Sequence, residues 1–260
     1  MPTSSKNTEI PSEIKKFSKP ILGVAAVLLA LGIAVTVFSG QKAERTKKAE
    51  NALFEARQKL DKNLTAIAAA QPAPAATGTS ESSAAKSKTP PAPPASMKPA
   101  QAESVAYLKL DVDTQLIEGA GELRNVAQQY GGTRAAHEAN LMLGDLYYNH
   151  GDAAKSITWY QAAVDTATDG SDRALSLYDL AYAYENSGKF PEAVKTYEKG
   201  MNQGEPALQG EIMLGLARSQ EKAGDKAKAK ETYTKISTQF PNTEVSKSAD
   251  IRKTRLEQAQ

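Results

Sequence analysis

The side chains that most often carry acid–base, nucleophilic or metal chemistry are few in this sequence. It has two histidines, His137 and His150, and no cysteine. Neither histidine has a second histidine at a metal-binding spacing, and the sequence contains no phosphate-binding glycine loop and no serine-nucleophile motif. We therefore expect His137 on a helix surface and His150 in a turn, with no metal site and no cofactor.

Pairs of carboxylates are the remaining candidates for acid–base work. Asp111 and Asp113 form one such pair, but in a chain with 30 acidic residues such pairs arise by chance. Aspartates in this setting more often cap or solvate a helix than take part in catalysis. We interpret this pair as structural, and we do not expect the protein to be an enzyme.

Charge is distributed unevenly along the chain. Residues 1–100 contain 14 Lys and Arg against 7 Asp and Glu, whereas residues 101–260 contain 18 against 23. A basic first part suits contact with anionic lipid headgroups. The mildly acidic remainder lacks the positive field on which nucleic-acid binding depends, so nucleic acid is not an expected partner.

An uncharged apolar run, Ile21–Phe38, indicates a membrane anchor. As a helix it would be about 27 Å long, which nearly spans a hydrocarbon core. A buried core helix would need apolar neighbours, and the residues that follow do not provide them. A cleaved signal peptide usually has a shorter apolar region, of about 7 to 15 residues. We therefore expect an uncleaved transmembrane helix at 21–39.

The orientation of this segment is not set by the flanking charges, because basic residues precede and follow it in equal number. A long C-terminal part tends to be translocated whatever its charge. We expect residues 1–20 in the cytoplasm and the C-terminal part outside it.

Two different segments follow the anchor. Residues 40–70 are rich in helix formers, with Leu53, Leu60, Leu64 and Ile67 on one side of the expected helix. This apolar side is too short for a stable coiled coil, so we expect an amphipathic helical stalk that packs on a local partner. Residues 71–100 contain seven prolines among Ala, Ser, Thr and Lys, and are expected to form a disordered linker.

An internal repeat is the strongest pattern in the sequence. Gly151, Gly188 and Gly224 recur at steps of 37 and 36 residues. Other columns keep the same register: a leucine eight residues before the glycine, a small residue five after it and a tyrosine nine after it, at Leu143, Leu180, Leu216, Ser156, Ala193, Ala229, Tyr160, Tyr197 and Tyr233. We expect each glycine to adopt a left-handed conformation at a helix end and each small residue to lie where two helices touch.

The same register extends in both directions. One period earlier, Ala120, Arg124 and Ala127 precede Tyr130, as expected for the second helix of a degenerate repeat. At the other end, 246–260 forms a polar helix suited to capping the stack. We therefore predict an all-α, helical-hairpin solenoid over residues 101–260, with three clear repeats, one degenerate repeat and a cap.

This pattern resembles the tetratricopeptide repeat, whose unit is two antiparallel helices. In that family the first helix of each unit lines a concave groove that binds proteins or peptides. The resemblance implies a groove lined by Leu141, Asp145, Tyr148, Asn149, Tyr178, Tyr182, Glu185, Asn186, Leu214, Arg218 and Glu221. We expect ligand contact from Tyr148, Tyr178, Tyr182 and Arg218, with Asn149 and Asn186 as hydrogen bonders to an extended backbone.

One partner class of the family is not favoured. Repeats of this type that clamp the C-terminal carboxylates of a chaperone use paired Lys and Asn side chains. Here Leu141 and Tyr178 stand at positions that would be basic.

With its anchor, stalk and repeats, the whole chain is similar to the bacterial envelope family that includes the ancillary SecYEG translocon subunit and the cell-division coordinator of the Tol system. The similarity implies a single-pass inner-membrane protein with a periplasmic C-terminal domain, anchored by Ile21–Phe38. It further implies a translocon-associated, chaperone-like adaptor whose partners are translocon subunits and unfolded envelope proteins. The long proline-rich segment favours an alternative, an envelope scaffold that links the inner membrane to cell-wall or division machinery.

Overall fold

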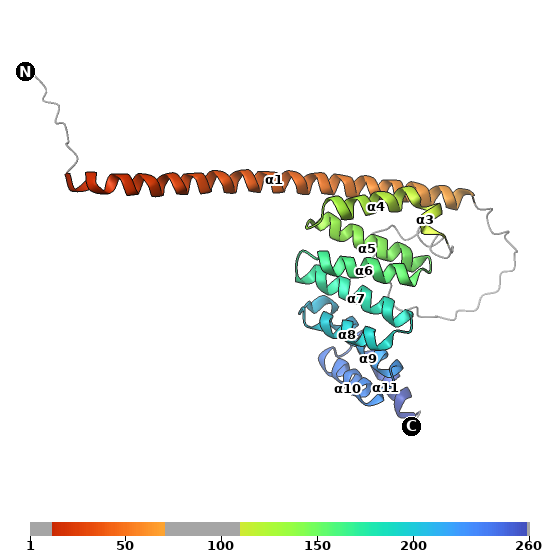
Figure 1. Ribbon diagram of the computed structural model, residues 1–260. Helices are drawn as coiled ribbons and strands as arrows, with labels where there is room; N and C mark the ends of the chain where they lie inside the picture. The colour runs from red at the N-terminus through yellow and green to blue at the C-terminus, as the bar shows by residue number, and fades with distance from the viewer. Residues whose placement is uncertain (1–11, 71–109, 259–260) are drawn as a thin grey trace, which may run out of the picture. The chain divides into compact units, whose positions relative to one another are not determined.

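All regular structure in the described part of the chain is helical. The computed structural model describes the backbone of residues 12–70 and 110–258, and the side chains of residues 39–70 and 110–258. The chain divides into two compact units, Met1–Lys48 and Ala49–Gln260. The predicted all-α class is confirmed (Figure 1).

The first helix, α1, extends from Ser12 to Ala70, so the backbone of Ile21–Phe38 is helical. The side chains of that segment lie outside those described. Within the described residues, no helix combines the length and apolar character needed to cross a bilayer. The transmembrane segment at 21–39 therefore stays a prediction. The linker at 71–100 also lies outside the described residues.

The three expected repeats are three consecutive helix pairs that stack in chain order (Figure 1). A last helix follows them and packs on α10, in the place expected for a cap. The bounds are α5 Arg134–Asn149 with α6 Ala153–Thr166, α7 Gly170–Asn186 with α8 Phe190–Met201, α9 Pro206–Lys222 with α10 Lys226–Gln239, and α11 Glu244–Gln258.

The turn glycines adopt the predicted conformation. Their φ angles are +85° at Gly151, +72° at Gly188 and +91° at Gly224. In each turn the backbone N–H of the next residue donates a 2.9 Å hydrogen bond to the carbonyl oxygen five residues earlier, which satisfies a terminal carbonyl of the first helix. The bond recurs in the third repeat although its acceptor residue there is Gln220, where the first two repeats have Tyr147 and Tyr184, because only backbone atoms take part.

The small and aromatic columns form the contact between helices. Ser156, Ala193 and Ala229 are fully buried, as predicted. The tyrosines of the second helices are buried with them, with exposed fractions of 3% or less, at Tyr160, Tyr197 and Tyr233. Close packing explains why larger residues are absent from these positions.

The degenerate repeat obtains its first helix from the end of α1. Its second helix is α4 (Ile117–Gln129), preceded by the short α3 (Val112–Gln115). Leu53 and Leu60 of α1 are buried in the same cluster as Leu123 of α4. The two backbones approach closely, because a Cβ added to Gly119 would lie 2.6 Å from the Cα of Leu60. The local partner of the stalk is therefore α4.

Candidate protein-binding face

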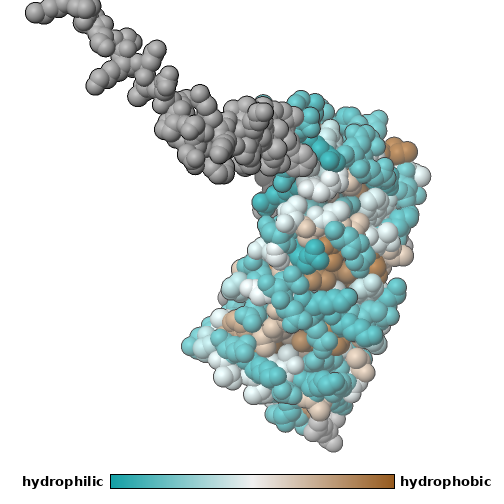
Figure 2. Space-filling view, turned by 60° about the vertical axis from the view of Figure 1, so that its left-hand side comes forward, coloured by the Kyte–Doolittle hydropathy of each residue, from teal (hydrophilic) through white to brown (hydrophobic). Residues whose placement is uncertain are grey.

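The first helices of the three repeats, α5, α7 and α9, carry all the side chains that were expected at the binding surface. We call the surface they form the first-helix face. The tyrosines on it are partly buried, and Asn149 and Asn186 are exposed. Leu141 and Leu214 instead pack into apolar clusters with α7 and α10 residues, respectively. The surface of the repeats seen in Figure 2 is mostly polar, with small apolar patches between polar side chains.

Three tyrosines form a continuous row across this face. The rings of Tyr148 and Tyr182 lie 5.7 Å apart and are tilted by 45°, and those of Tyr178 and Tyr182 lie 6.4 Å apart and are nearly parallel. Burial raises the pKa of Tyr178 to about 12, so its hydroxyl stays protonated at neutral pH. The row joins α5 to α7 and offers partly exposed aromatic surface.

Asn186 is engaged within the face itself. Its side-chain N–H groups donate to the hydroxyl oxygen of Tyr148 at 2.6 Å and to the carbonyl oxygen of Tyr182 at 3.1 Å. The amide oxygen of Asn186 is therefore the atom that could accept a hydrogen bond from a partner backbone.

Arg218 of α9 is bound to Glu185 of α7. Nε and Nη2 of Arg218 donate to the two carboxylate oxygens of Glu185 at 2.8 Å and 2.9 Å. The Tyr197 hydroxyl donates to the same carboxylate at 3.1 Å. The face thus places Arg218 beside the tyrosine row, with its charge neutralised by Glu185.

The tyrosines of the second helices each donate to a carboxylate on the first helix of the same repeat. Tyr160 donates to Asp145 at 2.7 Å, and Tyr233 donates to Glu221 at 2.9 Å, as Tyr197 does to Glu185. This hydrogen bond could be predicted from the sequence by two features: the recurring tyrosine, and an acidic residue near the end of the preceding helix.

One acidic residue of the face was not predicted. Asp179 of α7 is only 8% exposed. Burial raises the pKa of its carboxyl well above the usual range, and the charge of Asp145 raises it further. Burial also raises the pKa of Asp145, although the hydrogen bond from Tyr160 opposes the shift. The sequence signal that could have identified Asp179 is its position as an aspartate within an otherwise apolar stretch of helix.

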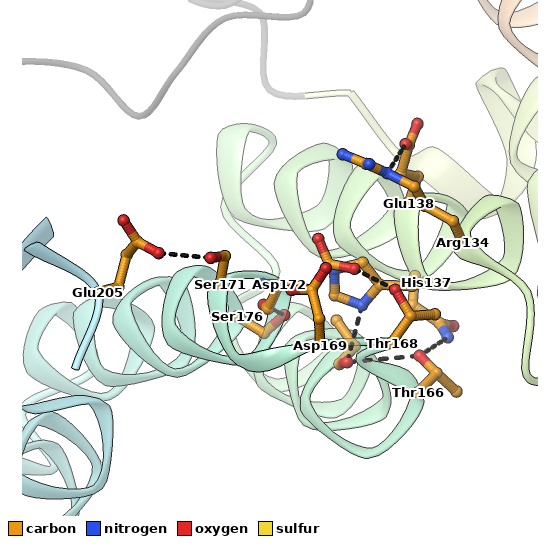
Figure 3. Close-up of polar contacts among 12 residues, drawn as sticks. Arg134, His137, Glu138, Thr166, Thr168, Asp169, Ser171, Asp172, Ser176 and Glu205 are labelled. Carbon is orange, nitrogen blue, oxygen red and sulfur yellow. Dashed lines mark hydrogen bonds and ion pairs between the residues drawn. The ribbon is translucent and has the colours of Figure 1, made fainter. Parts of the chain in front are cut away.

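The prediction that His137 lies on a helix surface is wrong. It is 1% exposed because the first turn of α5 packs against the end of α6, and its Nδ1 lies 3.0 Å from the carbonyl oxygen of Ala163 (Figure 3). Its Nε2 lies 4.0 Å from a carboxylate oxygen of Asp172. His150 lies in the turn after α5, as expected. Among the described residues, no three His, Asp or Glu side chains are grouped as metal ligands.

Stacked helix pairs with a left-handed glycine at each turn and small residues at each crossing define an α-helical repeat solenoid. Family models described as tetratricopeptide repeat match residues 137–169, 176–206 and 211–243. The chain therefore contains tetratricopeptide repeats, and this part of the predicted resemblance is confirmed. Repeats of this kind indicate a module that interacts with proteins.

Curated proteins gave no match. Two crystal structures of a protein from Podosopora anserina, assigned as a kinesin light chain with nearly identical TPR-like repeats, are similar at 17% identity and a TM-score of 0.47. One, of a substituted form, covers 56% of this chain and 79% of its own, and the other covers 62% and 88%.

Proposed function

We propose that the chain is a membrane-anchored adaptor whose first-helix face binds segments of other polypeptides. The observation that carries this proposal is the row formed by Tyr148, Tyr182 and Tyr178, which is partly exposed and fixed by ring contacts and by Asn186. Tyrosines provide large contact areas at a low cost in conformational entropy, and they are frequent anchors of protein interfaces. The proposed activity is binding and not catalysis.

The cellular role we propose is that of a translocon-associated, chaperone-like factor for exported or envelope proteins. It is supported by the similarity of the domain order to bacterial envelope proteins and by the apolar run Ile21–Phe38, which is long enough for an inner-membrane anchor. In this arrangement the N-terminus is cytoplasmic and the repeats are periplasmic. Protease should then degrade the repeats only after the outer envelope is opened, and degradation of repeats in inverted inner-membrane vesicles would contradict the orientation.

Site-specific crosslinking tests the binding role. A photoactivatable residue in place of Tyr178 or Tyr182 should capture channel subunits and newly exported chains. The matched control is the same residue in place of Lys195, which is exposed on α8, a second helix. Equal capture of the same proteins from Lys195 would contradict a role for the first-helix face.

An envelope scaffold is the second candidate. The seven prolines of residues 71–100 suggest it from the sequence, but these residues connect α1 to α4, which pack against each other, so their length cannot separate the repeats from α1. A scaffold should be crosslinked to cell-wall or division proteins, whereas an adaptor should be crosslinked to channel subunits and exported chains. The measurement is crosslinking from Tyr182 in the full chain, together with a test of envelope integrity in cells that lack the protein.

A further inference from the structure

Asp145 and Asp179 are two acidic groups of the first-helix face that lack a cation. Asp145 accepts one hydrogen bond, from Tyr160. Asp179 is more than nine-tenths buried, yet among residues 39–70 and 110–258 nothing donates a hydrogen bond to its carboxyl and no basic side chain forms an ion pair with it. A buried carboxyl that has no hydrogen-bond donor and no cation lowers the stability of the folded protein unless a partner is supplied.

Glu185, on the same helix as Asp179, shows what a carboxylate with a cation partner looks like in this fold. Glu185 also accepts from the tyrosine of its second helix, but it has Arg218 as a two-bond partner. The guanidinium of Arg218 is committed to Glu185. Glu211, on the same helix as Arg218, is acidic and acts on Tyr178. Within residues 39–70 and 110–258 no basic side chain is paired with Asp145 or Asp179, which leaves the positive charge to be supplied by a bound molecule.

Aromatic groups adjoin this pair. Tyr148 is one turn after Asp145 on α5, and Tyr182 is one turn after Asp179 on α7, so each lies on the same side of its helix as the aspartate. The rings of these tyrosines are in contact. Electron-rich ring faces beside carboxylates are the usual surroundings of a bound ammonium or guanidinium group.

We propose that the Asp145–Asp179 pair, with Tyr148 and Tyr182, accepts a lysine or arginine side chain of the bound polypeptide. This inference rests on the proposed function, because it assigns a chemical preference to the same face. The cation supplies hydrogen bonds to Asp179, neutralises the two carboxylates and packs its alkyl stem against the tyrosine rings. The bound cation would do for Asp145 and Asp179 what Arg218 of α9 does for Glu185.

The stability of the ligand-free protein gives a first prediction of this inference. Asp179→Asn keeps the shape of the side chain and removes the charge that burial disfavours. The variant should therefore melt at a higher temperature than the wild type at neutral pH. This is the result expected if Asp179 serves binding at a cost in stability. A lower melting temperature would show that Asp179 has a structural partner and would contradict the proposal.

The decisive experiment is peptide selection with the full chain in detergent micelles. A display library of random dodecapeptides is selected on the wild type, on Asp145→Asn/Asp179→Asn, on Tyr182→Ala and on a matched control, Asp165→Asn/Glu192→Gln. Asp165 and Glu192 are exposed on the second helices α6 and α8. Binders of the wild type should carry Lys or Arg at a shared position, and replacing it with norleucine should weaken binding at least about tenfold.

The affinity of the same peptide should fall about tenfold on Asp145→Asn/Asp179→Asn. On that variant the norleucine replacement should not weaken binding further, while the control variant should bind the peptide like the wild type. Binders that need Tyr182 but show no basic residue, or that keep their basic preference on the asparagine variant, would overturn the inference and leave the proposed function standing. Failure to select any binder that depends on Tyr182 would overturn both.

Discussion

Arg218 and Glu185 join the second and third repeats through a two-bond ion pair, with Nε and Nη2 of the arginine 2.8 Å and 2.9 Å from the two carboxylate oxygens. Both side chains are mostly buried, with exposed fractions of 17% and 13%. Tyr197 donates to the same carboxylate. The contact therefore links α9, α7 and α8 at one point.

Removal of the arginine should destabilise the stack. In Arg218→Ala the Glu185 carboxylate stays mostly buried without its cation, and we expect the free energy of unfolding to fall by about 2–4 kcal/mol. Urea unfolding of the full chain in micelles, followed by circular dichroism, measures the change. The matched control is Lys228→Ala, whose pair with Asp225 is exposed to solvent and should contribute much less to stability. Equal losses in the two variants would contradict the role of the buried pair.

Two glycine substitutions should have opposite effects. A Cβ added to Gly144 would lie 2.5 Å from Cε1 of Tyr160, so Gly144→Ala must displace the ring and weaken its bond to Asp145. We expect a loss of about 1–3 kcal/mol. Gly121 is also in a helix, but nothing lies within 4 Å of its added Cβ. Gly121→Ala should therefore stabilise the protein by about 0.5–1 kcal/mol, and unfolding midpoints that move in the same direction would contradict this packing.

The sequence predicts the parts of this fold that depend on backbone and size. Each of Gly151, Gly188 and Gly224 is required by a φ angle that other residues adopt at a cost, so the period is visible in the residue types. The pairing of α1 with α4 was not predictable in this way, because residues 71–109 separate the two helices and interrupt the period. His137 and Asp179 were also missed or misplaced, because the burial of a polar side chain depends on neighbours from another helix.

Stability at acid pH should depend on Asp113. Hydrogen bonds from Lys155 and Tyr147 and the nearby Arg124 lower the pKa of Asp113 from 3.8 to about 2. As pH falls, the unfolded chain takes up this proton first, so the stabilising contribution is complete above about pH 4 and is lost between about pH 4 and pH 2. Asp113→Asn should lower the melting temperature at neutral pH and flatten its decline over that window.

Lys155→Met gives an independent check of the same group. Without its ammonium partner, the pKa of Asp113 should rise toward its ordinary value, and the dependence of melting temperature on pH should become weaker in the same window. The measurement is the difference between variant and wild type at each pH, since other carboxylates titrate in both. An unchanged slope in both variants would show that these contacts do not persist in solution.

The end of α1 should stabilise the first repeat specifically. Leu60 is 1% exposed and packs in the cluster of α4, so Leu60→Ala should cost about 2–4 kcal/mol. In a stack of repeats each unit is stabilised mainly by its neighbours, so backbone amides of α4 and α5 should exchange faster while those of α10 stay protected.

Phe54→Ala is the matched control, because Phe54 is on the same helix but 61% exposed. Hydrogen exchange measured by mass spectrometry distinguishes the outcomes: unchanged protection of α4 in Leu60→Ala would mean that α1 does not act as the first helix of the degenerate repeat. Faster exchange confined to α4 and α5 would mean that the end of α1 is part of the stack of repeats.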